Sequence, residues 1–328
     1  MSTPLWKALL LERKLPWRYQ NWLKIPLWKQ VLKEHSLPWE YCHLFNGIFL
    51  NHITLSLLNL FGGTINIIDK FGGLGDTLLA AMVCKNIKKK YPKIKLNCKT
   101  THPDLLKNNP YIDSINKTKR FRPKLYVEYN EVLIKKNPHL NMISSCLNKI
   151  GIKNIEYKAD IFLSKEEKEF AKEKLKEMKR PIITINVKGG APTKDWPDKN
   201  WQKLVNLLVK KYDIIQLGSN TEPNLKNINR FAGFPIRESI AIQAHAKLHI
   251  GCESFFMHAA NAVNVLSVII LGGRSTPDNT CYQENKNIYI KTDCSPCWLN
   301  TPCPNNMKCM KPITPEIVYQ DAIEILGR

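Results

Sequence analysis

The chain has 328 residues, 44% of them hydrophobic, and a formal net charge of +21, so it can form a sizeable core and is not intrinsically disordered. Residues 1–160 contain 26 Lys or Arg and 11 Asp or Glu, a surplus that favours anionic partners such as acidic saccharides, lipid headgroups or nucleic acid. The chain shows no signal-peptide pattern, and the apolar run at 48–61 is too short and too polar to span a bilayer. We therefore expect a cytoplasmic protein whose ten cysteines are thiols or metal ligands.

Residues 1–62 combine five tryptophans with many lysines, arginines and regularly spaced prolines. Prolines at this spacing predict a helical N-terminal extension of short, broken helices. Tryptophan beside basic residues suits a membrane surface, and it equally suits an aromatic face packed on the first domain or on another subunit.

From Thr64 the sequence alternates between strand and helix patterns. The stretch Thr64–Lys90 predicts a strand rich in isoleucine, a turn with Gly72, Gly73 and Gly75, and a helix that begins near Asp76. Ligands of open α/β sheets bind beyond the carboxyl ends of the strands, so we expect Asp76 to point into a cleft. The alternative is that Asp76 only caps the helix.

The later elements repeat this alternation and predict an α/β protein with two parallel sheets. Further strands are expected at Ile94–Cys98, Ile182–Val187, Ile214–Leu217, Lys247–Ile250 and Leu266–Leu271. Further helices are expected at Pro103–Asn108, Ser164–Arg180, Lys199–Tyr212 and Ile236–His245, the second of them with a capping box of Ser164 and Glu167. We expect an extension at 1–62, an N-terminal domain at 63–163, an interdomain helix at 164–180 and a C-terminal domain at 181–328.

Three segments of the second half contain residues suited to a phosphorylated ligand. In the loop 188–197, Thr193 and Lys194 lie beside glycines and can bind phosphate oxygens. Glu253 and Ser254 lie where a helix is expected to begin, so free backbone N–H groups there could receive a diphosphate. Glu222 follows a strand and could bind ribose hydroxyls, or it is a plain loop carboxylate. None of the three is specific by itself, because strand-to-helix turns occur in nearly every α/β domain.

Two further patterns bear on which ligands the chain could bind. The segment GGLGD fails as a dinucleotide-binding fingerprint, because the third glycine position falls on Leu78. Near the C-terminus, four cysteines follow the pattern C-x2-C-x5-C-x5-C, namely Cys294, Cys297, Cys303 and Cys309. Four thiolates suit iron or zinc, and reduced thiols in a packed loop are the alternative.

Taken together, the motifs resemble glycosyltransferase family 9, the ADP-heptose:lipopolysaccharide heptosyltransferases. The resemblance rests on GGLGD, YPKIKL, NNPYIDSI, the K-x-W-P motif at Lys194 to Pro197, GCESFFMH and the cysteine-rich tail, in this order from about Thr64 to the end. GGLGD with the cysteine tail also resembles the branch that glycosylates bacterial autotransporter proteins.

The resemblance implies a GT-B fold with two Rossmann-like domains that face a cleft, the first for the acceptor and the second for the nucleotide sugar. It implies the catalytic base at Asp76, a diphosphate contact at Lys194, a nucleoside contact at Glu222, and a diphosphate-binding turn with Ser254 and His258. The chain departs from the family pattern around Ser254. Glu253 stands where the family usually has Asp, and Phe255 stands where it usually has Gly.

The function implied is inverting transfer of a heptose or related sugar from ADP-heptose to a lipopolysaccharide core or a protein. No D-x-D motif is present, which fits a transferase that needs no metal or other cofactor for catalysis, with any iron or zinc at the cysteines being structural. Peripheral contact with the inner membrane and a homo-oligomer are left open by the sequence, and nucleic acid is not expected as a partner. The alternatives are a basic nucleic-acid-binding protein with a four-cysteine metal element, and an inactive scaffold.

Overall fold

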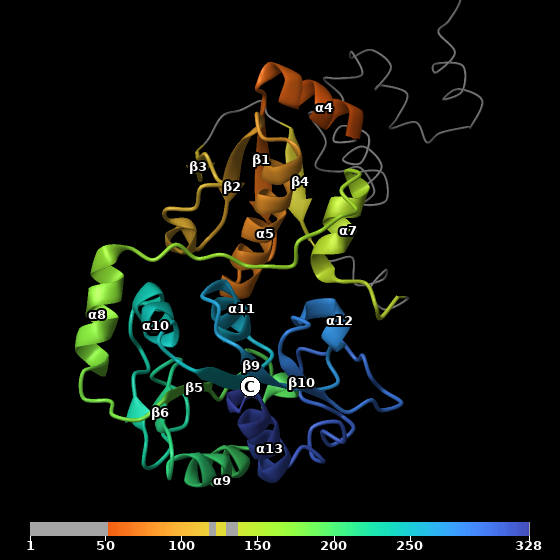
Figure 1. Cartoon of the computed structure of the whole chain (residues 1–328). Coiled ribbons are helices and arrows are strands. Elements are labelled where there is room, and N and C mark those ends of the chain that lie inside the picture. The colour runs from red at the N-terminus through yellow and green to blue at the C-terminus, as the bar shows by residue number, and fades with distance from the viewer. Residues whose placement is uncertain (1–51, 118–122, 129–136, 328) are drawn as a thin grey trace, which may run out of the picture. The chain divides into compact units, whose positions relative to one another are not determined.

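The computed structural model describes residues 52–117, 123–128 and 137–327, and the element labels follow Figure 1. Residues 1–51 of the expected N-terminal extension therefore lie outside the described residues. The remainder of that extension contains helix α4 (His52–Phe61), in which Leu55 is fully buried. No helix within the described ranges is both long enough and apolar enough to cross a membrane.

The first half of the described chain contains a four-stranded parallel sheet in the order β3-β2-β1-β4. Its strands are β1 (Thr64–Asp69), β2 (Lys95–Lys99), β3 (Ser114–Ile115) and β4 (Lys124–Val127). The helices of this half are α5 (Leu74–Lys90), the 3-10 helix η2 (Pro103–Leu106) and α7 (Met142–Lys149). The register pairs Asn66 with Asn97, and the Asn97 side-chain amide donates to Asn66 Oδ1 at 2.8 Å, which satisfies two buried polar groups in the sheet.

The second half contains a six-stranded parallel sheet in the order β10-β9-β8-β5-β6-β7. Its strands are β5 (Ile182–Asn186), β6 (Asp213–Gln216), β7 (Asn229–Arg230), β8 (Leu248–Cys252), β9 (Ser267–Leu271) and β10 (Lys286–Tyr289). The helices are α8 (Lys165–Leu175), the 3-10 helix η3 (Pro192–Lys194), α9 (Asp198–Leu208), α10 (Ile236–Gln243), α11 (Phe255–Ala262), α12 (Pro277–Thr280) and α13 (Pro315–Leu326).

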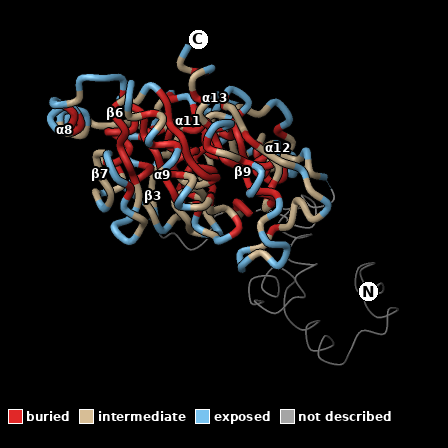
Figure 2. Tube along the Cα trace, turned by 90° about the horizontal axis from the view of Figure 1, so that it is seen from below, coloured by how far each residue is buried: buried red, intermediate tan, exposed pale blue. Residues whose placement is uncertain are grey.

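Helices cover both faces of the second sheet, with α9 and α13 on one side and α10 and α11 on the other (Figure 1). Strands such as Ile182–Asn186 are rich in isoleucine and buried at every residue, because a parallel sheet is covered on both faces. The traces of β6, β9 and α11 are accordingly mostly buried (Figure 2). The pattern of the sequence and the structure agree on a two-sheet α/β architecture.

The core of the first sheet continues into the second half of the chain. Met257 and Ala259 of α11, together with Ile269 of β9, belong to the same buried cluster as Ile65 of β1 and Leu78 of α5. Helix α11 therefore packs against α5 as well as against its own sheet. This contact brings the first turns of the two helices together.

The segment between α7 and α8 is held by side chains from both halves. Asn86 of α5 forms two hydrogen bonds with the backbone of Glu156, from its amide to the carbonyl oxygen and from the Glu156 N–H to Oδ1. Lys85 is buried and pairs with Glu156 and Asp160 at 2.6 Å each; burial lowers its pKa, but these carboxylates outweigh that effect and raise it. On the other side, the Ala159 N–H donates to Asn261 Oδ1 of α11 at 3.0 Å.

A buried arginine on α10 links three further segments. Arg237 forms a two-pronged pair with Glu167 of α8, and its guanidinium also donates to the carbonyl oxygens of Phe162 and Asp104. Glu167 is itself held by the capping box with Ser164, as the sequence predicts. A single side chain from the second half thus satisfies backbone acceptors on the linking segment and on η2.

Several element boundaries differ from the prediction. Helix α8 ends at Leu175 rather than Arg180, because the N–H groups of Lys179 and Arg180 both donate to Asp213, which holds the chain in a turn before β5. The segment at Pro103–Asn108 is a single 3-10 turn. The short edge strands β3, β4, β7 and β10 were not predicted, since two to four residues carry too little periodic signal.

We predict that Arg237→Lys lowers the free energy of unfolding by about 2–3 kcal/mol, because lysine cannot reproduce the forked pair with Glu167 or reach both carbonyl oxygens. Urea unfolding followed by circular dichroism measures the change. Lys172→Ala removes an exposed pair with Glu169 and serves as the control, with an expected effect within about 0.5 kcal/mol. Equal effects of the two substitutions would contradict this role of Arg237.

Candidate functional site

The glycine turn between β1 and α5 places Asp76 in the first turn of the helix. Gly73 occupies the N-cap position, and the carboxylate of Asp76, the third residue of the helix, caps the backbone N–H of Gly73. The Asp76 Oδ2 atom accepts from this N–H at 3.2 Å. Gly72 adopts φ +71°, a left-handed conformation that glycine reaches without strain.

A second carboxylate, which the sequence analysis did not single out, shapes this turn. Asp69 at the end of β1 accepts from the Gly72 N–H at 2.9 Å through Oδ1. Its Oδ2 accepts from the hydroxyls of Thr77 at 2.9 Å and Thr100 at 3.0 Å. Asp69 therefore fixes the path of the backbone that leads to Asp76. A carboxylate at the last position of a strand, followed by a glycine turn, is the signal that could have identified it.

Space for a side chain at residue 75 is limited, because His258 from the other half of the chain lies against Gly75. A β-carbon at this position would lie 3.2 Å from Cδ2 of His258 and 3.9 Å from Cα of Phe255. Gly75 has ordinary helical conformation, so the requirement is space rather than backbone freedom. The close approach brings His258 of α11 next to the residue that precedes Asp76.

At the start of α11, a buried carboxylate is held by a lysine and a serine. Glu253 is 4% exposed, and its two oxygen atoms contact Lys194 Nζ at 3.2 Å and the Ser275 hydroxyl at 2.8 Å. Burial raises the pKa of Glu253, but the charges of Lys194 and Arg274 and the Ser275 hydrogen bond outweigh it, so the pKa lies below its usual value. Lys194 and Glu253 are thus brought together as an ion pair.

The neighbouring Ser254 has a buried hydroxyl that, within the described ranges, has no hydrogen-bond partner. Ser254 is the N-cap of α11, yet its hydroxyl does not accept from the helix backbone. The first N–H groups of α11 and this hydroxyl are suited to bind a negatively charged ligand.

His258, one turn further along α11, is 7% exposed, and a hydrogen bond joins its Nδ1 atom and the Tyr282 hydroxyl oxygen, which lie 2.8 Å apart. Burial lowers the pKa of His258 to about 4, so the imidazole is neutral near pH 7. It therefore acts as a neutral hydrogen-bonding group beside the Lys194–Glu253 pair.

Glu222 lies on the loop after β6. Its Oε1 accepts from the Ser219 N–H at 2.9 Å, whereas Oε2 is buried without a hydrogen-bond partner among the described residues. Burial raises the pKa of Glu222. Because β8, β5 and β6 are neighbours, Glu253, Lys194 and Glu222 follow one another along the carboxyl edge of the sheet.

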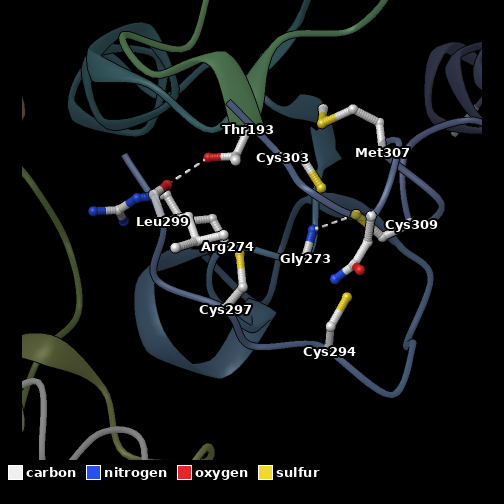
Figure 3. Close-up of a pocket in the computed structure, with 10 residues that line it drawn as sticks. Thr193, Gly273, Arg274, Cys294, Cys297, Leu299, Cys303, Met307 and Cys309 are labelled. Atoms are coloured by element: carbon white, nitrogen blue, oxygen red, sulfur yellow. Dashed lines mark hydrogen bonds between the residues drawn. The ribbon is translucent and has the colours of Figure 1, made fainter. Parts of the chain in front are cut away.

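Thr193, which we expected to bind phosphate, faces another way. Its hydroxyl donates to the Leu299 carbonyl oxygen at 2.6 Å, and the residue is 3% exposed (Figure 3). Thr193 therefore lines the cysteine segment, while the adjacent Lys194 faces Glu253.

The four cysteines surround a small cavity of about 10 Å³, about the size of one water molecule (Figure 3). They are Cys294, Cys297, Cys303 and Cys309. The Gly273 N–H donates to Cys309 Sγ at 3.1 Å, a contact that stabilises a thiolate. Within the described ranges, however, no three ligating side chains lie close enough together to hold a metal ion. The donor atoms thus fit iron or zinc in kind but not in their present spacing.

The profile of the family described as "Glycosyltransferase family 9 (heptosyltransferase)" matches residues 121–308, more than half of the chain. The chain belongs to this family. A comparison with curated protein sequences gave no match.

Solved structures of the family share the fold. ADP-heptose lipopolysaccharide heptosyltransferase II of Escherichia coli is 17% identical, with a TM-score of 0.62, over 80% of this chain and 98% of that one. The iron-containing dodecameric glycosyltransferase TibC of enterotoxigenic E. coli is 18% identical, with a TM-score of 0.64, over 80% of this chain and 75% of that one. TibC has also been solved with ADP-D-β-D-heptose. A family 9 glycosyltransferase of Veillonella parvula is 16% identical, with a TM-score of 0.63, over 80% and 97%. The expected family and the GT-B fold are confirmed.

Two buried histidines predict that the protein loses stability in acid. Burial lowers the pKa of His258 to about 4 and that of His249, which contacts Thr184 and Asn186, to about 3. Between about pH 4 and 6.5 the unfolded chain binds more protons than the folded one, so stability falls as the pH falls. We predict a loss on the order of 3 kcal/mol for each imidazole.

Urea unfolding at several pH values tests this prediction. His249→Gln removes one buried titrating group and should make the pH dependence shallower. His245→Gln is the control, because His245 is exposed and its ring stays in contact with water when the chain folds. A His249→Gln protein with the wild-type slope would exclude His249 as a source of the acid sensitivity.

Proposed function

We propose that this family 9 glycosyltransferase transfers a heptose or a closely related sugar from ADP-heptose, with inversion, to a hydroxyl of a lipopolysaccharide core or a protein. The observation that carries the proposal is the contact between the first turns of α5 and α11 at Gly75 and His258. Through this contact the turn with Asp76 lies against the helix whose N-cap residue, Ser254, has a buried hydroxyl with no hydrogen-bond partner among the described residues. Family membership favours a transferase over a nucleic-acid-binding protein or a scaffold.

Asp76 is proposed as the general base. As the acceptor oxygen attacks the anomeric carbon from the face opposite the diphosphate, its proton passes to the Asp76 carboxylate. The bond between the anomeric carbon and the diphosphate oxygen breaks in the same step, with an oxocarbenium-like transition state. The turn fixed by Asp69 holds the base in place during this step.

Lys194, Ser254 and the N-terminus of α11 are proposed to stabilise the departing diphosphate. Negative charge grows on that group as the bond breaks, and oriented donors in a site that excludes water contribute about 10²–10³ in rate each. Glu253 would keep Lys194 oriented through their ion pair. Glu222, with one buried oxygen that lacks a hydrogen-bond partner among the described residues, is proposed to accept hydrogen bonds from the ribose. Thr193 is proposed to hold the loop against the cysteine segment through its hydrogen bond to Leu299, rather than to bind phosphate.

The two domains are proposed to bind different substrates. We propose that residues 63–163 bind the acceptor, that residues 181–328 bind the nucleotide sugar, and that residues 164–180 join them. Peripheral contact with the inner membrane and a homo-oligomer remain predictions.

A thermal-shift and turnover experiment tests the function. ADP and ADP-heptose should raise the melting temperature, because a ligand that binds only the folded state stabilises it by mass action. Asp76→Asn should keep that shift and lose about 10³-fold or more in turnover of ADP-heptose. Lys194→Ala should instead lose most of the shift.

A different result would contradict each of these predictions. Stabilisation by GDP- or UDP-sugars and not by ADP compounds would exclude ADP-heptose as the donor. Transfer at the wild-type rate by Asp76→Asn would exclude Asp76 as the base. Lys203→Ala, a substitution on the surface helix α9, is the control and should change neither measurement.

For the cysteine segment we propose a structural iron or zinc ion, held after the four thiols close around the small cavity. Metal analysis of protein purified without chelator should find about one equivalent, and Cys294→Ser with Cys303→Ser should lose the metal and lower the melting temperature. Cys84→Ser, at a buried cysteine of α5, is the control and should keep the metal. Wild-type protein without stoichiometric iron or zinc would refute this proposal.

A further inference from the structure

Tyr282 forms a buried pair with His258. The tyrosine follows α12, is 4% exposed, and lies edge-on to the imidazole with ring centres 5.7 Å apart at 83°. Its hydroxyl contacts Nδ1 of His258 at 2.8 Å. This is the one hydrogen bond of the His258 side chain within the described part of the protein.

The opposite edge of the imidazole faces the helix of the other half. Cδ2 and Nε2 of His258 lie 3.2 and 3.7 Å from the place where a β-carbon on Gly75 would stand. Across the described ranges, Nε2 has no hydrogen-bond partner in the protein. The charges of Glu253 and Lys194 also act on this ring, so Nε2 belongs to the candidate site.

The position of the proton follows from the two groups together. Burial raises the pKa of Tyr282 well above its usual value, so the phenol keeps its proton, and His258 is neutral. A neutral imidazole carries one N–H, at Nδ1 or at Nε2. With the proton on Nδ1, the buried Tyr282 O–H would have no acceptor among the described residues, at a cost of about 1–3 kcal/mol. With the proton on Nε2, the Tyr282 O–H donates to Nδ1 and both groups are satisfied.

We propose that Tyr282 is a positioning residue that holds His258 in the Nε2–H form and aims this N–H at an oxygen atom of the bound nucleotide sugar. The inference rests on the proposed function for the identity of that ligand. It adds a residue outside every motif in the sequence, since Tyr282 belongs to the loop between α12 and β10.

The first experiment measures the tautomer directly. Nitrogen NMR of isotope-labelled protein distinguishes a protonated from an unprotonated ring nitrogen, and His258→Gln assigns the signal among the eight histidines. We expect the Nε2–H form in the wild type and a mixture of both forms in Tyr282→Phe. A wild-type signal from the Nδ1–H form, or a Tyr282→Phe signal identical to wild type, would overturn the proposal.

The second experiment compares kinetics. Tyr282→Phe should lower kcat/KM about tenfold, whereas Tyr91→Phe, which removes another buried tyrosine hydroxyl at the far end of α5, should stay within about twofold. Glutamine places an amide N–H near the position of Nε2, and asparagine places one near Nδ1. His258→Gln should therefore retain at least about tenfold more activity than His258→Asn.

A double substitution separates positioning from packing. In the His258→Gln background, Tyr282→Phe should have an effect within about twofold, because no tautomer remains to be fixed. A full tenfold loss in that background would assign Tyr282 a packing role and refute the proposal. Failure of ADP-heptose to bind the wild type would refute the proposed donor and leave the tautomer result standing, so the two failures are distinguishable.

Discussion

The close approach of α5 and α11 at Gly75 is the constraint on which the site depends. Protein interiors are close-packed, and a β-carbon at residue 75 would lie 3.2 Å from Cδ2 of His258, so the imidazole would have to move by a few tenths of an ångström. Since α11 follows β8 directly, any movement of α11 away from α5 would also move Ser254 and Glu253. The absence of one β-carbon thus sets the spacing between the carboxylate turn of the first sheet and the anion-binding turn of the second.

The buried charge of Glu253 is compensated by partners within the protein. A buried carboxylate is costly unless it is paired and hydrogen-bonded, and Glu253 has both a lysine and a serine as partners. The pair holds Lys194 in position and limits the side-chain entropy that ligand binding would otherwise cost. The buried Ser254 hydroxyl, without a partner among the described residues, is the polar group that a ligand would satisfy.

The sequence predicted the two-sheet architecture, the glycine turn and the capping box of α8, because these depend on local patterns of apolar residues, glycines and caps. It could not predict the contact of Asp69 with Thr100, the contact of His258 with Gly75, or Tyr282 as the partner of His258, because each contact joins residues far apart in the chain. Thr193 shows that a local pattern can also predict a contact that the packing does not allow. Its sequence context suited phosphate binding, but whether a hydroxyl faces a ligand or a carbonyl oxygen depends on the packing of the tail segment, which no local pattern encodes.

Thr193 and Lys194 are adjacent residues of one 3-10 turn that serve two different neighbours. The hydroxyl of Thr193 belongs to the wall of the cysteine cavity, and the amine of Lys194 belongs to the pair with Glu253. A shift of this turn would therefore affect both regions at once. Loss of the Leu299 carbonyl acceptor would leave the Thr193 hydroxyl without its partner in the cysteine segment, whereas loss of the Glu253 carboxylate would leave Lys194 without its ion pair.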